Sequence, residues 1–289
     1  MSFNKKNILV LGVSGMLGST VMRFLSSFNE YHVTGTVRSQ LSITYLPKFI
    51  HSSIIKGIDI LEVDALERLF DKVKPEVVIN CIGLVKQLSE TNDPLITLPI
   101  NSLFPHRLAK ISANFGARLI HMSTDCVFAG IKGMYTESDI TDAQDLYGVS
   151  KRLGEVDYPN AVTIRTSIIG HELNGSRSLV DWFLSQEIVV KGFKRAVFSG
   201  LPTIEIARII RDYLIPIPQL TGVYHVSADP INKFDLLSLV ADIYRKDIRL
   251  EEDNDFVIDR SLDSSRFREK TGYTPPSWQE LITSMRDTK

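Results

Sequence analysis

The chain is 289 residues long, 44% of them hydrophobic and 23% charged, and its formal net charge is −1 at pH 7. This length is long for one domain and short for two independent ones, and the near-neutral charge without a basic block argues against nucleic acid or an anionic membrane surface as a partner. No apolar run approaches the roughly 20 residues that span a bilayer, no signal sequence is recognisable, and Cys81 and Cys126 lie in apolar runs without zinc-ligand spacing. These features predict a soluble cytoplasmic protein without a metal site.

The elements predicted in chain order alternate between strand and helix up to residue 166. Short apolar runs typical of strands buried on both faces are followed by apolar residues at helical spacing. The predicted strands are residues 7–12, 31–37, 75–80, 118–123 and 161–165, and the predicted helices are residues 16–27, 64–73, 101–115 and 147–156. This alternation predicts an α/β fold, a Rossmann-type doubly wound parallel sheet.

The alternation is looser in the last third of the chain. Helices are predicted at residues 179–186, 203–214, 234–244 and 278–285, and a strand at residues 223–226. No clear linker precedes them. We therefore expect residues 167–289 to form a smaller, partly interleaved region that caps the carboxyl edge of the sheet.

A glycine-rich turn joins the first predicted strand to the first predicted helix. Its spacing is Gly12-x-x-Gly15-x-x-Gly18, which permits a tight turn, close approach of a pyrophosphate and packing of the helix on the strand. The helix N-terminus then offers free N–H groups to the phosphates. Ordinary turn glycines are the alternative. The candidate phosphate-binding residues are Gly12, Ser14, Gly15, Met16, Leu17 and Gly18.

The end of the second predicted strand bears on cofactor choice. An acidic residue there would accept from the ribose 2′-hydroxyl of NAD, but residues 36–39 contain no carboxylate. Arg38 could instead pair with a 2′-phosphate. We therefore expect NADP(H), with NAD(H) as the alternative if Arg38 is only a solvated loop residue.

The residues with the clearest chemical meaning are Thr124, Tyr147 and Lys151. Tyr147-x-x-x-Lys151 places a phenol and an ammonium one helical turn apart, and Thr124 lies at the end of a predicted strand. A phenol has a pKa of about 10, and a nearby ammonium lowers it toward working pH. This set suits proton transfer at a carbon–oxygen bond. The Tyr-x-x-x-Lys pair by itself is often only a surface pair.

With these pieces in order, the chain resembles the extended short-chain dehydrogenase/reductases, and within them the dTDP-4-dehydrorhamnose reductase group of nucleotide-sugar reductases. The resemblance covers nearly the whole length and is densest up to residue 167. It rests on the glycine turn, Asp59-Ile60, Asn80-Cys-Ile-Gly83, Ser123-Thr-Asp-Cys-Val-Phe128, Tyr147-Gly-Val-Ser-Lys151 and Ile164-Arg-Thr-Ser167. It implies that residues 1–166 form an NADP(H)-binding domain with the catalytic residues, and residues 167–289 a substrate-binding region.

The resemblance also implies roles for individual residues. Thr124, Tyr147 and Lys151 would be catalytic, Lys151 would also hold the nicotinamide ribose, and Asn101 would organise a water that relays protons. Asp59 and Ile60 would contact the adenine. The cofactor contacts implied beyond the glycine turn and Arg38 are Asp59, Ile60, Cys81, Ile82, Gly83, Ser123 and Thr166.

Four residues are candidate substrate contacts. Lys86, with Gln87 beside it, falls where relatives contact substrate, and Asp125 follows the catalytic Thr124. Trp182 could stack on a base, although core packing is the commoner role. Arg260 could reach a diphosphate, although a surface ion pair is its alternative. The candidates are Lys86, Asp125, Trp182 and Arg260.

The implied reaction is reduction of a 4-keto nucleotide sugar to a deoxysugar nucleotide for polysaccharide or glycan precursors. Sugar dehydratases of this superfamily carry Asp-Glu after the threonine, whereas this chain has Asp125-Cys126. Two alternatives stay open: a nucleotide-sugar epimerase with bound NAD, and a regulatory subunit such as the beta subunit of methionine adenosyltransferase. The predicted partner is the nucleotide sugar. A homodimer is compatible with the sequence, which leaves the oligomeric state open.

Overall fold

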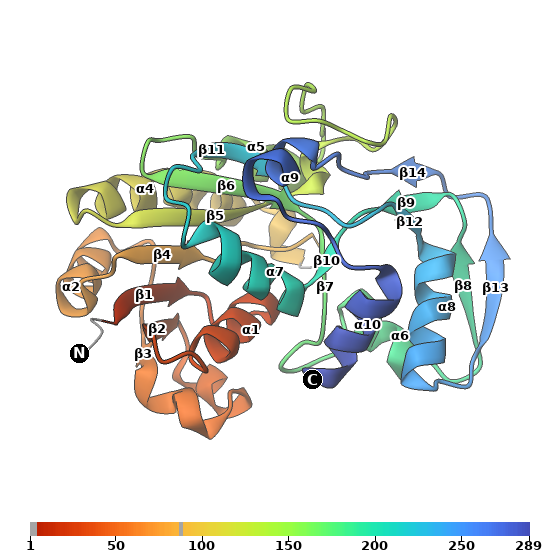
Figure 1. Cartoon of the computed structure of the whole chain (residues 1–289), viewed down its shortest axis with the longest axis horizontal. Helices are drawn as coiled ribbons and strands as arrows, with labels where there is room; N and C mark the ends of the chain where they lie inside the picture. The colour runs from red at the N-terminus through yellow and green to blue at the C-terminus, as the bar shows by residue number, and fades with distance from the viewer. Residues whose placement is uncertain (1–4, 87–88) are drawn as a thin grey trace.

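A seven-stranded parallel sheet forms the body of the molecule (Figure 1). The computed structural model describes residues 5–86 and 89–289, so Gln87 lies outside the described residues. Across the sheet the strand order is β11-β6-β5-β4-β1-β2-β3. The strands are β1 (Lys6–Leu11), β2 (Tyr31–Val37), β3 (Ile54–Lys56), β4 (Val77–Asn80), β5 (Arg118–Thr124), β6 (Ala161–Thr166) and β11 (Gly222–His225).

Both faces of this sheet are covered by helices. Along β1, Ile8 and Val10 belong to the core beneath α1 and α7, whereas Leu9 and Leu11 belong to the core beneath α2 and α4. Side chains of a strand alternate between faces, so a strand buried on both faces is apolar throughout. The covering helices are α1 (Met16–Leu25), α2 (Val63–Val73), α4 (Phe104–Asn114), α5 (Leu146–Leu153) and α7 (Thr203–Ile209).

Several helices carry irregular extensions. α3 (Pro94–Leu98) runs into the π-helical segment η4 (Pro99–Leu103) before α4 begins, and α7 continues into the π-helical η6 (Ile210–Leu214). Short 3-10 segments fill other connections: η1 (Gln40–Tyr45), η2 (Lys48–Ser53), η3 (Ser89–Asn92) and η5 (Asp125–Val127). The helix predicted from residue 101 thus lies within a longer helical stretch that begins at Pro94.

A smaller region lies beyond the carboxyl ends of the large sheet, on the right of Figure 1. Its core joins Phe183, Val190, Leu237 and Ile282. Its strands are β7 (Ile168–Ile169), β8 (Val189–Phe193), β9 (Ala196–Phe198), β10 (Leu201–Pro202), β12 (Ile231–Asn232), β13 (Arg249–Asp253) and β14 (Ile258–Asp259). Its helices are α6 (Leu179–Ser185), α8 (Lys233–Tyr244) and α10 (Trp278–Asp287), while α9 (Ser265–Thr271) packs beside β11.

The fold class predicted from the sequence is confirmed: the large sheet is parallel and doubly wound, with smaller sheets formed by the last third of the chain. Most of the short strands of the smaller region, and β3, were not predicted, because segments of two to five residues carry little periodic signal. The division at residue 166 stays a prediction. None of the described helices is long and apolar enough to cross a membrane.

Candidate active site

The candidate site lies where the strand order reverses. β1 and β4 are neighbours at the centre of the sheet, and the chain builds outward from them in opposite directions. In such sheets a crevice opens at the carboxyl ends of the two central strands. Gly12 follows β1 and Cys81 follows β4, and the Cys81 N–H donates to the Leu11 carbonyl at 3.2 Å. The two loops that could hold a dinucleotide therefore meet directly.

Two glycines of the turn are required by close contacts. Gly12 has a φ of +82°, and a Cβ there would lie 2.7 Å from Ile82 Cγ1. A Cβ at Gly18 would lie 2.2 Å from the Gly12 carbonyl oxygen, so α1 can pack on the turn only with glycine at that position. At Gly15 the nearest atom would be 3.5 Å away, which leaves its outer side open.

The N-terminus of α1 is free to bind an anion. Gly15 is the N-cap residue and no side chain caps the helix, so the first N–H groups face the crevice unpaired. Ser14 is exposed and Met16 half-buried, whereas the Leu17 side chain is buried in the core, which leaves only its backbone to reach a ligand. The open helix end and the glycine turn fit a dinucleotide diphosphate.

The predicted adenosine contacts share one side of the crevice. Arg38 follows β2 and Asp59 follows β3, and these strands are paired neighbours. Arg38 is exposed, with no hydrogen bond or ion pair to any residue that the structure describes. Asp59 Oδ1 accepts from the Leu61 N–H at 3.0 Å, and Ile60 packs against the core beneath α2. The exposed guanidinium is available for a 2′-phosphate.

Thr124 and Tyr147 meet at the carboxyl end of β5. Thr124 Oγ1 donates to Asp125 Oδ1 at 3.1 Å and accepts from the Cys126 N–H at 3.1 Å. Burial raises the pKa of the Tyr147 phenol, Cys126 adds to that effect, and a hydrogen bond with the Thr124 side chain opposes it. The spacing of Tyr147 and Lys151 predicts that Lys151 lowers this pKa. In the structure burial is the larger effect, and the phenol is protonated at neutral pH.

The approach of α5 to the catalytic strand depends on Gly148. A Cβ at Gly148 would lie 2.3 Å from the Cys126 carbonyl oxygen and 2.6 Å from Ala143 Cβ. Asp145 caps the helix by accepting from the Gly148 N–H at 3.0 Å. This contact brings Tyr147 to the end of β5. Gly148 lies within the Tyr147–Lys151 motif, but nothing in the sequence pattern indicates this packing role.

Lys151 lies deeper than Tyr147. It is 5% exposed, and its ammonium donates to the Met122 carbonyl at 2.7 Å. Burial lowers the pKa of Lys151 to about 8, and the Glu155 carboxylate opposes that shift. A Cβ placed at Gly83 would lie 3.6 Å from Lys151 Nζ, so the ammonium borders the loop after β4, on the predicted cofactor side.

Asn101 ties that same loop to α5. It lies in the π-helical η4, a form often found at functional sites. Its Oδ1 accepts from the Leu84 N–H at 2.9 Å, and its Nδ2 donates to Ser150 Oγ at 3.1 Å. Asn101 is 1% exposed. It fixes the distance between the loop after β4 and the catalytic helix, and its role toward a water stays a prediction.

The hydroxyls of Ser123 and Thr166 bond within the protein. Ser123 Oγ donates to Glu155 at 2.7 Å, and Thr166 Oγ1 donates to the Ser167 carbonyl at 3.1 Å. Glu155 forms a buried bidentate pair with Arg165, at 2.7 and 2.8 Å. The predicted cofactor contacts of Ser123 and Thr166 would therefore use other atoms. The Glu155–Arg165 pair stabilises this part of the site, and no sequence pattern indicated it.

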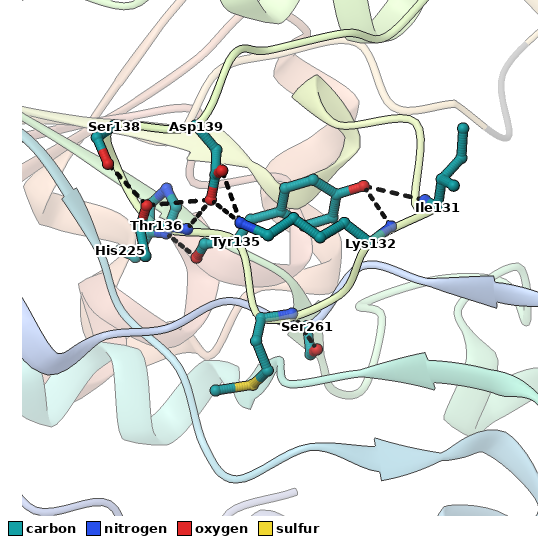
Figure 2. Close-up of polar contacts among 9 residues, drawn as sticks. Ile131, Lys132, Tyr135, Thr136, Ser138, Asp139, His225 and Ser261 are labelled. Atoms are coloured by element: carbon teal, nitrogen blue, oxygen red, sulfur yellow. Dashed lines mark hydrogen bonds and ion pairs between the residues drawn. The ribbon is translucent and has the colours of Figure 1, made fainter.

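The loop between β5 and α5 is held in shape by Tyr135 (Figure 2). The Tyr135 hydroxyl accepts from the N–H groups of Ile131 and Lys132, at 2.9 and 3.0 Å. The His225 ring bonds the Tyr135 carbonyl at 2.9 Å, and the Ser261 carbonyl accepts from the Tyr135 N–H at 2.9 Å. This loop thus anchors the segment that carries Arg260.

The structure brings three of the four substrate candidates together. Lys86 pairs with Asp145 at 3.1 Å. Arg260 donates to the Phe128 carbonyl at 2.9 Å and approaches Cys126 Sγ at 3.7 Å, and Asp125 is 5% exposed beside Thr124. Trp182 is 39% exposed on α6, and nothing in the described part of the chain links it to these three. The described residues contain no group of three His, Cys, Asp or Glu side chains that could hold a metal ion.

Comparison with known proteins gives a consistent set of relatives. Methionine adenosyltransferase 2 subunit beta of Xenopus laevis is 25% identical over 302 residues, which cover 96% of this chain and 80% of that protein. The probable low-salt glycan biosynthesis reductase Agl14 of Haloferax volcanii is 30% identical over 165 residues, covering 55% of this chain and 52% of that protein.

The fold is shared with a solved reductase. A dTDP-4-dehydrorhamnose reductase from Bacillus anthracis, in complex with NADP, superposes with a TM-score of 0.80 at 18% identity over 99% of this chain and 100% of that chain. The family model described as RmlD substrate binding domain matches residues 6–288. The protein therefore belongs to the RmlD substrate-binding domain family.

Proposed function

We propose that this protein is a cytoplasmic NADP(H)-dependent reductase that converts a 4-keto nucleotide sugar to a deoxysugar nucleotide. The observation that carries the proposal is the pairing of Thr124 with Tyr147 at the carboxyl end of β5, in the crevice that the glycine turn opens. A reductase of glycan biosynthesis and a dTDP-4-dehydrorhamnose reductase are among the proteins it resembles. We infer a role in glycan-precursor synthesis from those relatives.

Each side chain has a separate role in carbonyl reduction. NADPH supplies the hydride when it is bound. The protonated Tyr147 phenol donates its proton to the carbonyl oxygen as negative charge develops there. The Thr124 hydroxyl, which donates to Asp125 in the structure, turns to the same oxygen as a second donor. Lys151, whose ammonium borders the loop after β4, would hold the cofactor ribose and supply positive charge there. The phenol carries the proton that reduction requires, as an unshifted phenol also would at neutral pH.

Dehydration is disfavoured by the residue after Asp125. Burial raises the pKa of the Cys126 thiol to about 12, so this side chain is protonated at neutral pH and cannot act as a base. A dehydratase needs an acid and a base at the sugar. This favours reduction over elimination at this site.

Replacing Tyr147 by phenylalanine tests the proposed reaction. We expect Tyr147→Phe to lower kcat for a 4-keto nucleotide sugar by about 100-fold or more, because general acid catalysis contributes about 10²–10⁴. NADPH consumption is measured against dTDP-, UDP-, GDP- and CDP-linked ketosugars. Tyr158→Phe is the matched control, since Tyr158 bonds His106 at 3.0 Å away from the crevice. Near-normal turnover by Tyr147→Phe would contradict the mechanism.

The same assay separates the alternatives. An epimerase with bound NAD would convert its substrate without net NADPH consumption. A regulatory role is favoured by one observation, the likeness to methionine adenosyltransferase 2 subunit beta over 96% of the chain. A stoichiometric enzyme partner in a pull-down, together with no reduction of any ketosugar, would replace the reductase proposal by that one.

A further inference from the structure

Lys233 is a charged residue near the catalytic segment that the sequence did not single out. It is the first residue of α8 and directly follows β12, which pairs with β9. Its ammonium lies 3.5 Å from the centroid of the Phe198 ring, and Phe198 is 4% exposed on β9. A cation over an aromatic face at this distance is held by the ring quadrupole. Phe198 therefore restricts where the ammonium can go.

The ammonium of Lys233 has no carboxylate partner. Among the residues whose side chains the structure describes, no ion pair involves Lys233, and the twelve pairs found there involve other groups. Burial lowers the pKa of Lys233 to about 8, and the nearby Asp125 and Cys126 oppose the shift. A buried charge is costly unless an opposite charge compensates it. A half-buried, unpaired ammonium beside the catalytic segment is thus suited to an anionic ligand.

Arg260 approaches the same segment from the other side of β9. β9 lies between β12 and β14 in a three-stranded sheet. Lys233 follows β12, and Arg260 follows β14 and contacts Cys126 and Phe128. Arg260 therefore contacts the segment directly after Thr124, and the Lys233 ammonium, over Phe198, lies close enough to Asp125 and Cys126 for their charges to act on it.

The charges around residues 125–128 do not cancel. The cations are Lys86, Lys233 and Arg260, and the carboxylates are Asp125 and Asp145. Asp145 is paired with Lys86 at 3.1 Å, and Asp125 accepts from Thr124 at 3.1 Å. Lys233 and Arg260 are left beside a single buried carboxylate. An excess of positive charge raises the local concentration of anions.

We propose that Lys233, acting with Arg260, binds the diphosphate of the nucleotide sugar. This inference rests on the proposed function in one respect: it takes a nucleotide sugar as the ligand of the site. The diphosphate lies between the β12-β9-β14 sheet and residues 125–128, which leaves the sugar beside Thr124 and Tyr147. Lys233 supplies a compact point charge, and the guanidinium of Arg260, already bonded to Phe128, supplies a fixed one.

Titration calorimetry with UDP, dTDP, GDP and CDP tests this assignment. NADP⁺ is kept in excess so that the cofactor crevice cannot take up the diphosphate. We expect the wild type to bind at least one of the four, and Lys233→Met to weaken that binding about 10- to 100-fold, the loss typical of one charge-assisted hydrogen bond. Lys233→Arg should retain most of the affinity, and the parent nucleoside should show no difference between the variants.

The controls separate charge from folding. Lys191→Met removes a lysine whose side chain is 71% exposed on β8, and should leave diphosphate affinity unchanged. NADPH affinity, measured separately, should not change in Lys233→Met. Thermal melts verify that the variants are folded; Lys233→Gln takes the place of Lys233→Met if that variant does not fold, with the same expectation.

Three results would overturn the assignment. Lys233→Met could bind the nucleoside diphosphate as tightly as the wild type does, or it could lose as much affinity for NADPH as for the diphosphate. The third result is that the wild type binds none of the four nucleoside diphosphates. None of these measurements requires turnover. Reduction that survives Tyr147→Phe would refute the proposed mechanism and leave diphosphate binding by Lys233 intact. Unchanged diphosphate affinity would refute the role of Lys233 whether or not the protein reduces a ketosugar.

Discussion

At the residue scale, two opposing effects set the pKa of Lys151. Burial disfavours its charge, whereas the Glu155 carboxylate favours it. Glu155 is itself fixed by Arg165 and by Ser123. The carboxylate that favours the charged lysine is therefore oriented by two other side chains, and the balance of burial and this carboxylate holds the pKa of Lys151 near neutral pH.

The pH dependence of turnover follows from this balance. The pKa of Lys151 is about 8, so the folded protein loses the ammonium as pH rises through 8. We expect kcat/KM for the ketosugar to fall above pH about 8, and Lys151→Arg, which does not titrate there, to move this descending limb to higher pH. A pH–rate profile from pH 6 to 10 measures it; an unchanged limb in Lys151→Arg would assign the limb to another group.

The free energy of unfolding should rise with pH over the range in which turnover falls. The pKa of Lys151 is lowered from 10.5 in the unfolded chain to about 8 in the folded protein. Between these values the unfolded chain binds the proton that the folded protein has released, so the free energy of unfolding contributed by this group rises with pH. Lys151→Met serves as the control, since it should remove this rise.

At the element scale, the site depends on how closely α5 packs on the end of β5. Gly148 permits that contact, and Asn101 in η4 fixes α5 to the loop after β4. The sequence predicted each of these helices from its apolar periodicity. Periodicity cannot report the spacing between two helices, because that spacing depends on side chains from separate parts of the chain.

Adding one methyl group to Gly148 tests this contact. We expect Gly148→Ala to lower kcat by about 10- to 100-fold, since a displacement of about 1 Å at reacting groups can cost about 100-fold, and the new Cβ would lie 2.3 Å from the Cys126 carbonyl oxygen. Steady-state kinetics measure it. Val149→Ala, on the same helix, adds no atom and should retain activity. Full activity of Gly148→Ala would show that the helix can shift without harm to the site.

At the scale of the whole molecule, the two segments of the chain share one sheet. β11, from the second segment, pairs in parallel with β6, and α7 packs against α1. Without them β6 would become an edge strand with unpaired N–H and C=O groups, and the core beneath α1 would lose apolar residues such as Ile206 and Val226. The predicted domains therefore would not fold independently.

Two spectroscopic probes test this interdependence. The two tryptophans, Trp182 and Trp278, both lie in residues 167–289, whereas far-UV circular dichroism reports the whole chain. We expect both signals to change at the same urea concentration, as in two-state unfolding, and residues 1–166 expressed alone to give no cooperative transition. Two separated transitions, or a stable fragment of residues 1–166, would instead establish independent domains.

The sequence by itself determined the fold class, the position of the glycine turn and the identity of the family. These features depend on local sequence patterns. Buried strands are continuously apolar, the apolar residues of helices recur about every 3.6 residues, and the residues of the glycine turn are contiguous. The motif that joins Tyr147 to Lys151 is equally local, since one helical turn separates the two residues.

Only the tertiary structure decided which side chains surround Thr124, Tyr147 and Lys151. Lys233 is 109 residues from Thr124 along the chain, and Arg260 is 136 residues away, yet both face the segment after Thr124. Burial also reversed the expected shift in the pKa of Tyr147. Burial and charge depend on distances in space, and the pairing of β9 with its two neighbours, which no local pattern encodes, sets those distances.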